Sequence, residues 1–231
     1  MDAAGRPRVV AGMQGREPMT PAPEGVNGKD LAVLVGHGHQ ALPDGSGPED
    51  EAAACAAAAL LTALGVTLDG EHRRGTPARL ARALREMLTP PQFDPTTFGN
   101  ADGYDELVVV EAVPFFSLCE HHILPFAGTA TVAYVPGARI IGLSKLAWSV
   151  QLFARRLQVQ ERMTAQIADW LVENLEPRGV GVRLRAEHMC MSLRGARAAG
   201  AVTTTSARRG VIADEPARRD EWLRVLSAVP G

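Results

Sequence analysis

The sequence has few cysteines, little net charge and no long apolar run, and each absence excludes a class of protein. Three cysteines in 231 residues are too few for a disulfide framework. A formal net charge of −2 argues against a general nucleic-acid-binding surface. No apolar run approaches bilayer-spanning length, and no signal sequence opens the chain. With 46% hydrophobic residues for a core, we expect a soluble cytoplasmic protein without nucleic-acid or membrane partners.

Two clusters far apart in the chain hold most of the residues that could bind a metal. The first runs from Cys119 to His122, and the second is His188-Met-Cys. Structural zinc sites normally close with four protein ligands, whereas three ligands leave a position open for water. Cys119, His122 and Cys190 therefore predict an open Zn2+ site, since two thiolates and an imidazole favour zinc. A purely structural zinc site is the alternative.

The second cluster lies in a segment with the pattern of a β-strand. Every second residue of this segment belongs to one set, which is Val180, Val182, Leu184, Ala186, His188 and Cys190. Residues of one parity project from the same face, so His188 and Cys190 are expected side by side, one to move a proton and one to bind metal. In the first cluster, a short turn lets Cys119 and His122 converge on one ion. His121 then points elsewhere, which frees it for acid–base work.

The chain divides into a tail and one domain. Residues 1–47, rich in Gly, Pro and Ala, are expected to form a flexible arm before a domain over 48–231. An alanine-rich helix is expected over 48–65, with Cys55 in the core, and Thr76 is expected to cap the next helix ahead of Pro77. Strands follow at 106–113 and 129–135, then helices from near Ser144 and Gln160. Two further strands and a helix over 216–226 complete an α+β domain with helices on one face of an antiparallel sheet.

Several longer motifs resemble one known family. They are Phe116-Ser-Leu-Cys-Glu-His-His-Ile-Leu-Pro, Gly142-Leu-Ser-Lys, Gln158-Val-Gln-Glu-Arg-Met-Thr, His188-Met-Cys-Met-Ser-Leu-Arg-Gly and Thr203-Thr-Thr-Ser. In this order, from about Thr76 to the C-terminus, they resemble the zinc-dependent GTP cyclohydrolase I family. The resemblance implies that residues 48–231 form a catalytic domain of the tunnelling fold, in which sheets of several subunits join into an oligomeric barrel. It also implies a toroidal homodecamer with active sites between subunits.

The resemblance further implies a reaction and roles for individual residues. GTP would be converted to 7,8-dihydroneopterin triphosphate and formate, the first step of folate or pterin biosynthesis. His188 is expected to protonate N7 of guanine and His121 to act later, while Ser144, near a helix start, would hold phosphate or a sugar hydroxyl. Glu161 would accept the guanine N1 and N2 hydrogens, and Gln160 would complete that edge. The basic residues implied to bind the triphosphate are Lys145, Arg194, Arg79 and Arg82.

Two positions depart from the family pattern: Arg82 replaces a more usual lysine and keeps the charge, whereas the second departure changes the chemistry. Trp148 stands where the family commonly has an arginine, three positions after Lys145. Tryptophan at this spacing is more often a packing residue, because Leu152 lies four positions on in the same helix. Two alternatives to the GTP reaction therefore remain open at the level of sequence. One is a catalytically silent binding protein that keeps zinc, and the other is an enzyme of the same fold acting on a related purine or pterin.

Overall fold

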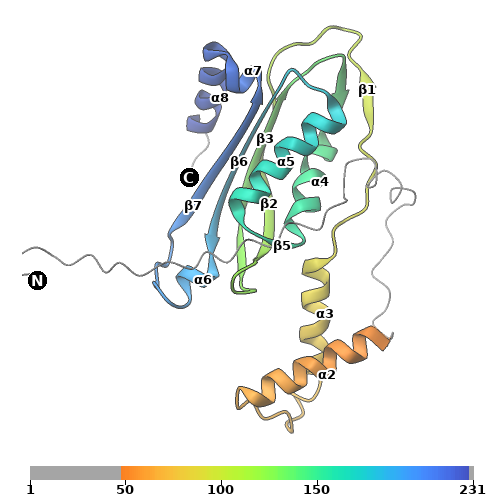
Figure 1. Ribbon diagram of the computed structural model, residues 1–231, viewed down its shortest axis with the longest axis vertical. Helices are drawn as coiled ribbons and strands as arrows, with labels where there is room; N and C mark the ends of the chain where they lie inside the picture. The colour runs from red at the N-terminus through yellow and green to blue at the C-terminus, as the bar shows by residue number, and fades with distance from the viewer. Residues whose placement is uncertain (1–47, 229–231) are drawn as a thin grey trace, which may run out of the picture.

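The computed structural model describes residues 48–228, and its first two helices form a hairpin at one end of the molecule (Figure 1). α2 (Pro48–Ala63) carries Glu49, Asp50 and Glu51 in its first turn, where negative charge stabilises a helix. This confirms the alanine-rich helix. The prediction of a core position for Cys55 is wrong, since α2 lies away from the sheet and leaves this thiol exposed. The expected arm, residues 1–47, lies outside the described residues.

The second helix of the hairpin is α3 (Thr76–Leu88), which starts one residue earlier than predicted. Gly75 occupies the N-cap position, so the prediction that Thr76 caps the helix is wrong. The Thr76 hydroxyl instead accepts a hydrogen bond of 2.9 Å from the Arg79 guanidinium. An ion pair of 2.6 Å between Arg85 and Asp50 joins α3 to α2.

A five-stranded sheet forms the body of the molecule, in the order β5-β2-β3-β6-β7. Its strands are β5 (Leu157–Gln158), β2 (Val108–Cys119), β3 (Pro125–Val135), β6 (Gly179–His188) and β7 (Val202–Gly210). Neighbouring strands are antiparallel except β2 and β5, which confirms the α+β class with a mainly antiparallel sheet. A separate pairing of β1 (Thr97–Gly99) with β4 (Arg139–Ile141) was not predicted, because both strands have only three residues.

Two helices, α4 (Leu143–Ala154) and α5 (Gln160–Leu175), cover one face of this sheet (Figure 1). α5 buries the residues predicted from their helical spacing, which are Met163, Ile167, Trp170 and Leu171. They pack in one core with Val132 of β3 and Val182 of β6. Each such side chain contributes about 1.5–3 kcal/mol when fully buried, so this layer fixes the position of α5 over the sheet. No helix within residues 48–228 is both long and apolar enough to cross a membrane.

The opposite face carries helices at one end, so the prediction of helices on a single face is incomplete. α7 (Val211–Asp214) and α8 (Pro216–Ala228) lie beside β7, away from α4 and α5 (Figure 1). Trp222 of α8 is fully buried with Ala133 and Val135. Because successive strand residues point to opposite faces, the side chains of these two β3 residues project from the face opposite the main core. Gly181 lies under the indole, where an added Cβ would be 2.9 Å from the ring.

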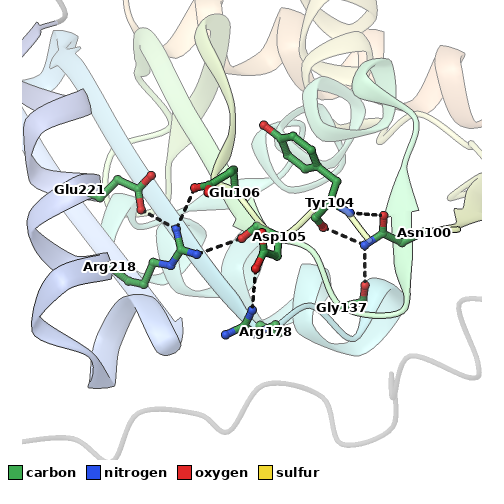
Figure 2. A network of polar contacts seen from close by, with 8 residues as sticks. All are labelled: Asn100, Tyr104, Asp105, Glu106, Gly137, Arg178, Arg218 and Glu221. Carbon is green, nitrogen blue, oxygen red and sulfur yellow. Dashed lines mark hydrogen bonds and ion pairs between the residues drawn. The ribbon is translucent and has the colours of Figure 1, made fainter. Parts of the chain in front are cut away.

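α8 is also tied to the segment that enters β2 (Figure 2). The Arg218 guanidinium lies 2.9 Å from Glu221 on the same helix and 3.2 Å from Glu106. It also donates to the backbone oxygen of Asp105 at 3.1 Å. Arg218 therefore links residues more than 100 positions apart and holds the C-terminal helix against the start of the second strand.

Candidate functional site

The three predicted metal ligands come together where β2 turns into β3 and β6 runs into a short helix, α6 (Met189–Ser192). The ligand atoms of Cys119, His122 and Cys190 all lie within 4.8 Å of one another. Cys119 is buried, Cys190 is half-buried and His122 is exposed, so the group is open to solvent on the histidine side. Two thiols and an imidazole match the ligands of zinc, and three protein ligands leave one position for an exchangeable fourth.

Cys190 reaches this group from a helical turn and not from the strand that was predicted. β6 ends at His188, and Leu193 closes the turn by donating to the Met189 oxygen at 3.1 Å. The physical reason is the loss of strand partners, since Phe126 is the β3 residue paired with His188 and β3 begins only one residue before it. Past this point the backbone satisfies its hydrogen bonds locally. His188 and Cys190 therefore do not share one strand face.

The turn from Cys119 to Leu124 is held by backbone bonds and by one ion pair. Ile123 donates to the Cys119 oxygen at 2.8 Å and has a φ of +54°, which is uncommon for a β-branched residue. Glu120 forms an ion pair with Arg162 of α5, and this hydrogen bond lowers the pKa of the Glu120 carboxyl. Sequence reasoning missed this pair because its members are 42 positions apart. The ion pair connects the metal-binding turn to α5.

The two adjacent histidines take different orientations around Cys119. Nδ1 of His121 and Nδ1 of His122 each lie 3.8 Å from the Cys119 sulfur, but their rings are inclined by 77°. His122 also lies close to Cys190, whereas His121 is outside that three-residue group. The group formed by Cys119, His122 and Cys190, without His121, matches the ligands that were expected. An acid–base role for His121 stays a prediction.

The two thiols influence each other. Burial raises the pKa of the Cys190 thiol, and the neighbouring Cys119 sulfur raises it further. Arg194 opposes this shift with its positive charge, which places a cation near the metal-binding group. A metal cation between the sulfurs would favour their thiolate forms, because it replaces repulsion between two anions with attraction to a shared charge.

His188 is held in a fixed orientation at the end of β6. Its ring stacks flat on Phe126, with 4.6 Å between the ring centroids and 3° between the planes. Its Nε2 lies 2.7 Å from Oε1 of Gln160, whose side chain is only 2% exposed. Burial lowers the pKa of His188, and the charge of nearby Glu161 acts in the opposite direction. The tertiary structure thus gives His188 two partners, Phe126 and Gln160, whose contacts with it the sequence pattern did not predict.

Ser144, Lys145 and Glu161 lie in the first turns of the two helices on the sheet. The N-cap of α4 is Gly142, and Ser144 lies inside the first turn of the helix. Ser144 is exposed, whereas Lys145 is half-buried with its ammonium 5.9 Å from the centre of the Phe93 ring. Glu161 is exposed in the first turn of α5.

The predicted phosphate-binding arginines occupy two separate places. Arg194 is exposed just after α6, close to Cys190. Arg79 and Arg82 are exposed on α3, which Figure 1 shows set apart from α6. The Arg79 guanidinium donates locally to the His72 oxygen at 2.7 Å. A single chain therefore brings Arg194 to the metal-binding group but leaves the two α3 arginines away from it.

Trp148 of α4 belongs to an aromatic cluster with Phe93 and with Trp170 of α5. Its ring lies 6.2 Å from that of Phe93, which is 5.6 Å from Trp170. Trp170 is 7% exposed and Trp148 is half-buried. Lys145, one turn earlier on α4, approaches the same Phe93 ring. These contacts favour a packing role for Trp148.

Comparison with known proteins identifies relatives that span the whole site. The family model described as GTP cyclohydrolase I matches residues 53–227. GTP cyclohydrolase 1 from Mycobacteroides abscessus is 46% identical over 206 residues, which is 87% of this chain and 98% of the relative. GTP cyclohydrolase 1 from Aquifex aeolicus is 47% identical over 73% of this chain and 92% of its own length. That from Corynebacterium glutamicum is 48% identical over 77% of this chain and 93% of its own length.

Proposed function

This chain belongs to the GTP cyclohydrolase I family, and we propose that Cys119, His122 and Cys190 hold the zinc ion of its active site. It is an enzyme, a GTP cyclohydrolase I, that hydrolyses and rearranges GTP to 7,8-dihydroneopterin triphosphate and formate. This reaction is the first step of folate and pterin biosynthesis. The observation that carries the zinc proposal is the convergence of three metal-binding atoms within 4.8 Å.

The metal-binding residues suit a catalytic ion better than a structural one. When bound, zinc lowers the pKa of a coordinated water toward about 7, which supplies a nucleophile near neutral pH. Cys119 and Cys190 hold the buried side of the group, and exposed His122 leaves access from solvent. Both cysteines must stay reduced to bind metal, so we propose that the protein works in the reducing cytoplasm.

Two histidines beside the metal group are the proton carriers in this proposal. His188 donates a proton to N7 of guanine, which withdraws electrons from C8 and prepares it for attack. Its stacking on Phe126 fixes the ring plane before substrate binds. His121, whose Nδ1 lies 3.8 Å from the Cys119 sulfur but which is not a ligand, serves the later proton transfers. Ser144, exposed near the start of α4, binds a sugar hydroxyl during rearrangement.

Glu161 recognises the guanine base. Its carboxylate is exposed in the first turn of α5 and close enough to influence the charge of His188. A carboxylate can accept hydrogen bonds from both N1 and N2 of guanine, which distinguishes this base from adenine. Gln160 is 2% exposed, and its side chain is already hydrogen-bonded to His188. It therefore affects substrate binding indirectly, by positioning that histidine.

The triphosphate needs cations from more than one place. Arg194 and Lys145 supply two of them, while Arg79 and Arg82 are exposed on α3, apart from the metal group of their own chain (Figure 1). We propose that the chain forms a homo-oligomer, a decamer with a barrel of joined sheets, in which these arginines complete the site of another subunit. Exposed apolar residues near the site support such an interface, since Leu193 is 72% and Leu143 is 61% exposed.

Formate release from GTP by the purified protein tests this function, with zinc content measured on the same sample. We expect turnover that is lost when zinc is removed and restored when zinc is returned. His188→Ala should keep zinc and bind GTP but lose ring opening, because its role is proton transfer. A protein that binds zinc yet releases no formate would be a silent paralogue. Turnover of guanosine or a pterin in preference to GTP would instead indicate a shifted substrate.

A further inference from the structure

A buried polar network lies behind His188, on the side of the ring that bears Nε2. Gln160 and Thr164 on α5 are each 2% exposed, and Thr205 on β7 is half-buried. The Gln160 side-chain nitrogen donates to the Thr205 hydroxyl at 3.1 Å, and the Thr164 and Thr205 hydroxyl oxygens are 2.6 Å apart. The network therefore connects β7 to His188 through α5.

The surroundings of Gln160 decide which end of its amide faces His188. The Thr203 and Leu184 backbone oxygens lie 3.1 and 3.3 Å from the amide nitrogen. Backbone carbonyls only accept hydrogen bonds, so the NH2 group must face them. The amide oxygen is thereby directed at Nε2 of His188, 2.7 Å away. An oxygen cannot donate, so Nε2 must carry the hydrogen of this bond.

The two threonine hydroxyls complete a consistent direction for every hydrogen in the network. Thr164 donates to the backbone oxygen of Gln160, 2.7 Å away and one helical turn earlier. Thr205 then donates to Thr164 and accepts from Gln160. Rotating the Gln160 amide by half a turn would place its oxygen against two carbonyl oxygens in a buried site, which is strongly unfavourable.

We infer that the Gln160–Thr205–Thr164 network is a positioning device that keeps one hydrogen of His188 on Nε2, facing Gln160, so that Nδ1 is the nitrogen that takes up a proton from solvent and delivers it to N7 of guanine. This inference rests on the proposed function, because it assigns the reacting nitrogen of the histidine used there. With Phe126 fixing the ring plane, both orientation and tautomer are set before GTP binds. A catalytic group that already has its reactive orientation needs no rearrangement during the reaction.

Gln160→Met tests the device in the zinc-loaded protein, because methionine has a similar volume but forms no comparable hydrogen bond. We expect kcat to fall about 10- to 100-fold, as when an outer partner of an active-site histidine is removed, with zinc content and KM for GTP unchanged. Nitrogen NMR of histidine-labelled protein should show His188 protonated at Nε2 in the wild type and a mixture of tautomers in the variant. His188→Ala identifies the signal.

Thr205→Val and Thr205→Ser provide a second, milder pair that preserves the β-branched or hydroxyl character of the strand residue. The valine variant should lower kcat severalfold and the serine variant should restore it, while Thr204→Val, exposed at the neighbouring position, should match the wild type. A raised KM with unchanged kcat in Gln160→Met would overturn the inference and make Gln160 a guanine ligand. A neutral wild-type His188 that carries its hydrogen on Nδ1 would also overturn it. If His188→Ala itself keeps full turnover, the proposed role of His188 fails instead.

Discussion

Trp148→Arg separates a packing role from a phosphate-binding role at the clearest departure from the family pattern. Trp148 stacks on Phe93 at 6.2 Å, and Phe93 in turn contacts buried Trp170. An arginine would lose an aromatic pair worth about 0.5–1.5 kcal/mol beyond its buried area. It would also bring a second cation beside Lys145, which already approaches Phe93 at 5.9 Å.

The expected loss of stability follows from the burial of this side chain. Removing a fully buried tryptophan costs about 3–5 kcal/mol, and Trp148 is half-buried, so we expect about 2 kcal/mol. In a chain of this size that corresponds to a fall in Tm of about 4–8 °C. Calorimetry would measure it, with Trp148→Phe as the control that keeps an aromatic ring and most of the stability.

GTP kinetics of the same variant test the opposite interpretation. If Trp148 occupied a phosphate-binding position, the new guanidinium would add a charge-assisted hydrogen bond of about 1.5–3 kcal/mol and lower KM tenfold or more. We expect KM to stay the same or rise. An unchanged Tm together with a tenfold lower KM would refute the packing role that the aromatic contacts support.

Three further substitutions test the metal group, the base contact and the second core. Cys190→Ser should lose the bound zinc, about one ion per chain, together with turnover, whereas Cys55→Ser on exposed α2 should keep both in metal analysis and formate assays. Glu161→Gln should raise KM for GTP more than it lowers kcat, because an amide leaves one guanine donor poorly paired; a pure loss of kcat would contradict this. Gly181→Ala, whose Cβ would lie 2.9 Å from a buried indole, should lower the free energy of unfolding by about 1–3 kcal/mol in denaturant titration. Gly99→Ala, with no atom within 4 Å, is the matched control.

The main helices and strands, and the residue types of the metal group, could be predicted from the sequence. Helical spacing identified the buried face of α5, and the types and spacing of Cys119, His122 and Cys190 identified a three-ligand group. These features are readable because they depend on neighbours within a few residues, or on side-chain chemistry that survives any reasonable fold. The motifs also carried the family resemblance.

The tertiary structure decided how those residues face one another. Strand parity placed Cys190 beside His188, but the chain leaves the sheet at His188 because pairing with β3 ends there, and a helical turn carries Cys190 to Cys119. The partner of His188 is Gln160, 28 positions earlier, on a helix whose position is set by burial of the same face that carries Gln160. Such contacts follow from where strands stop pairing and how layers pack, and neither is encoded in the periodicity of a single segment.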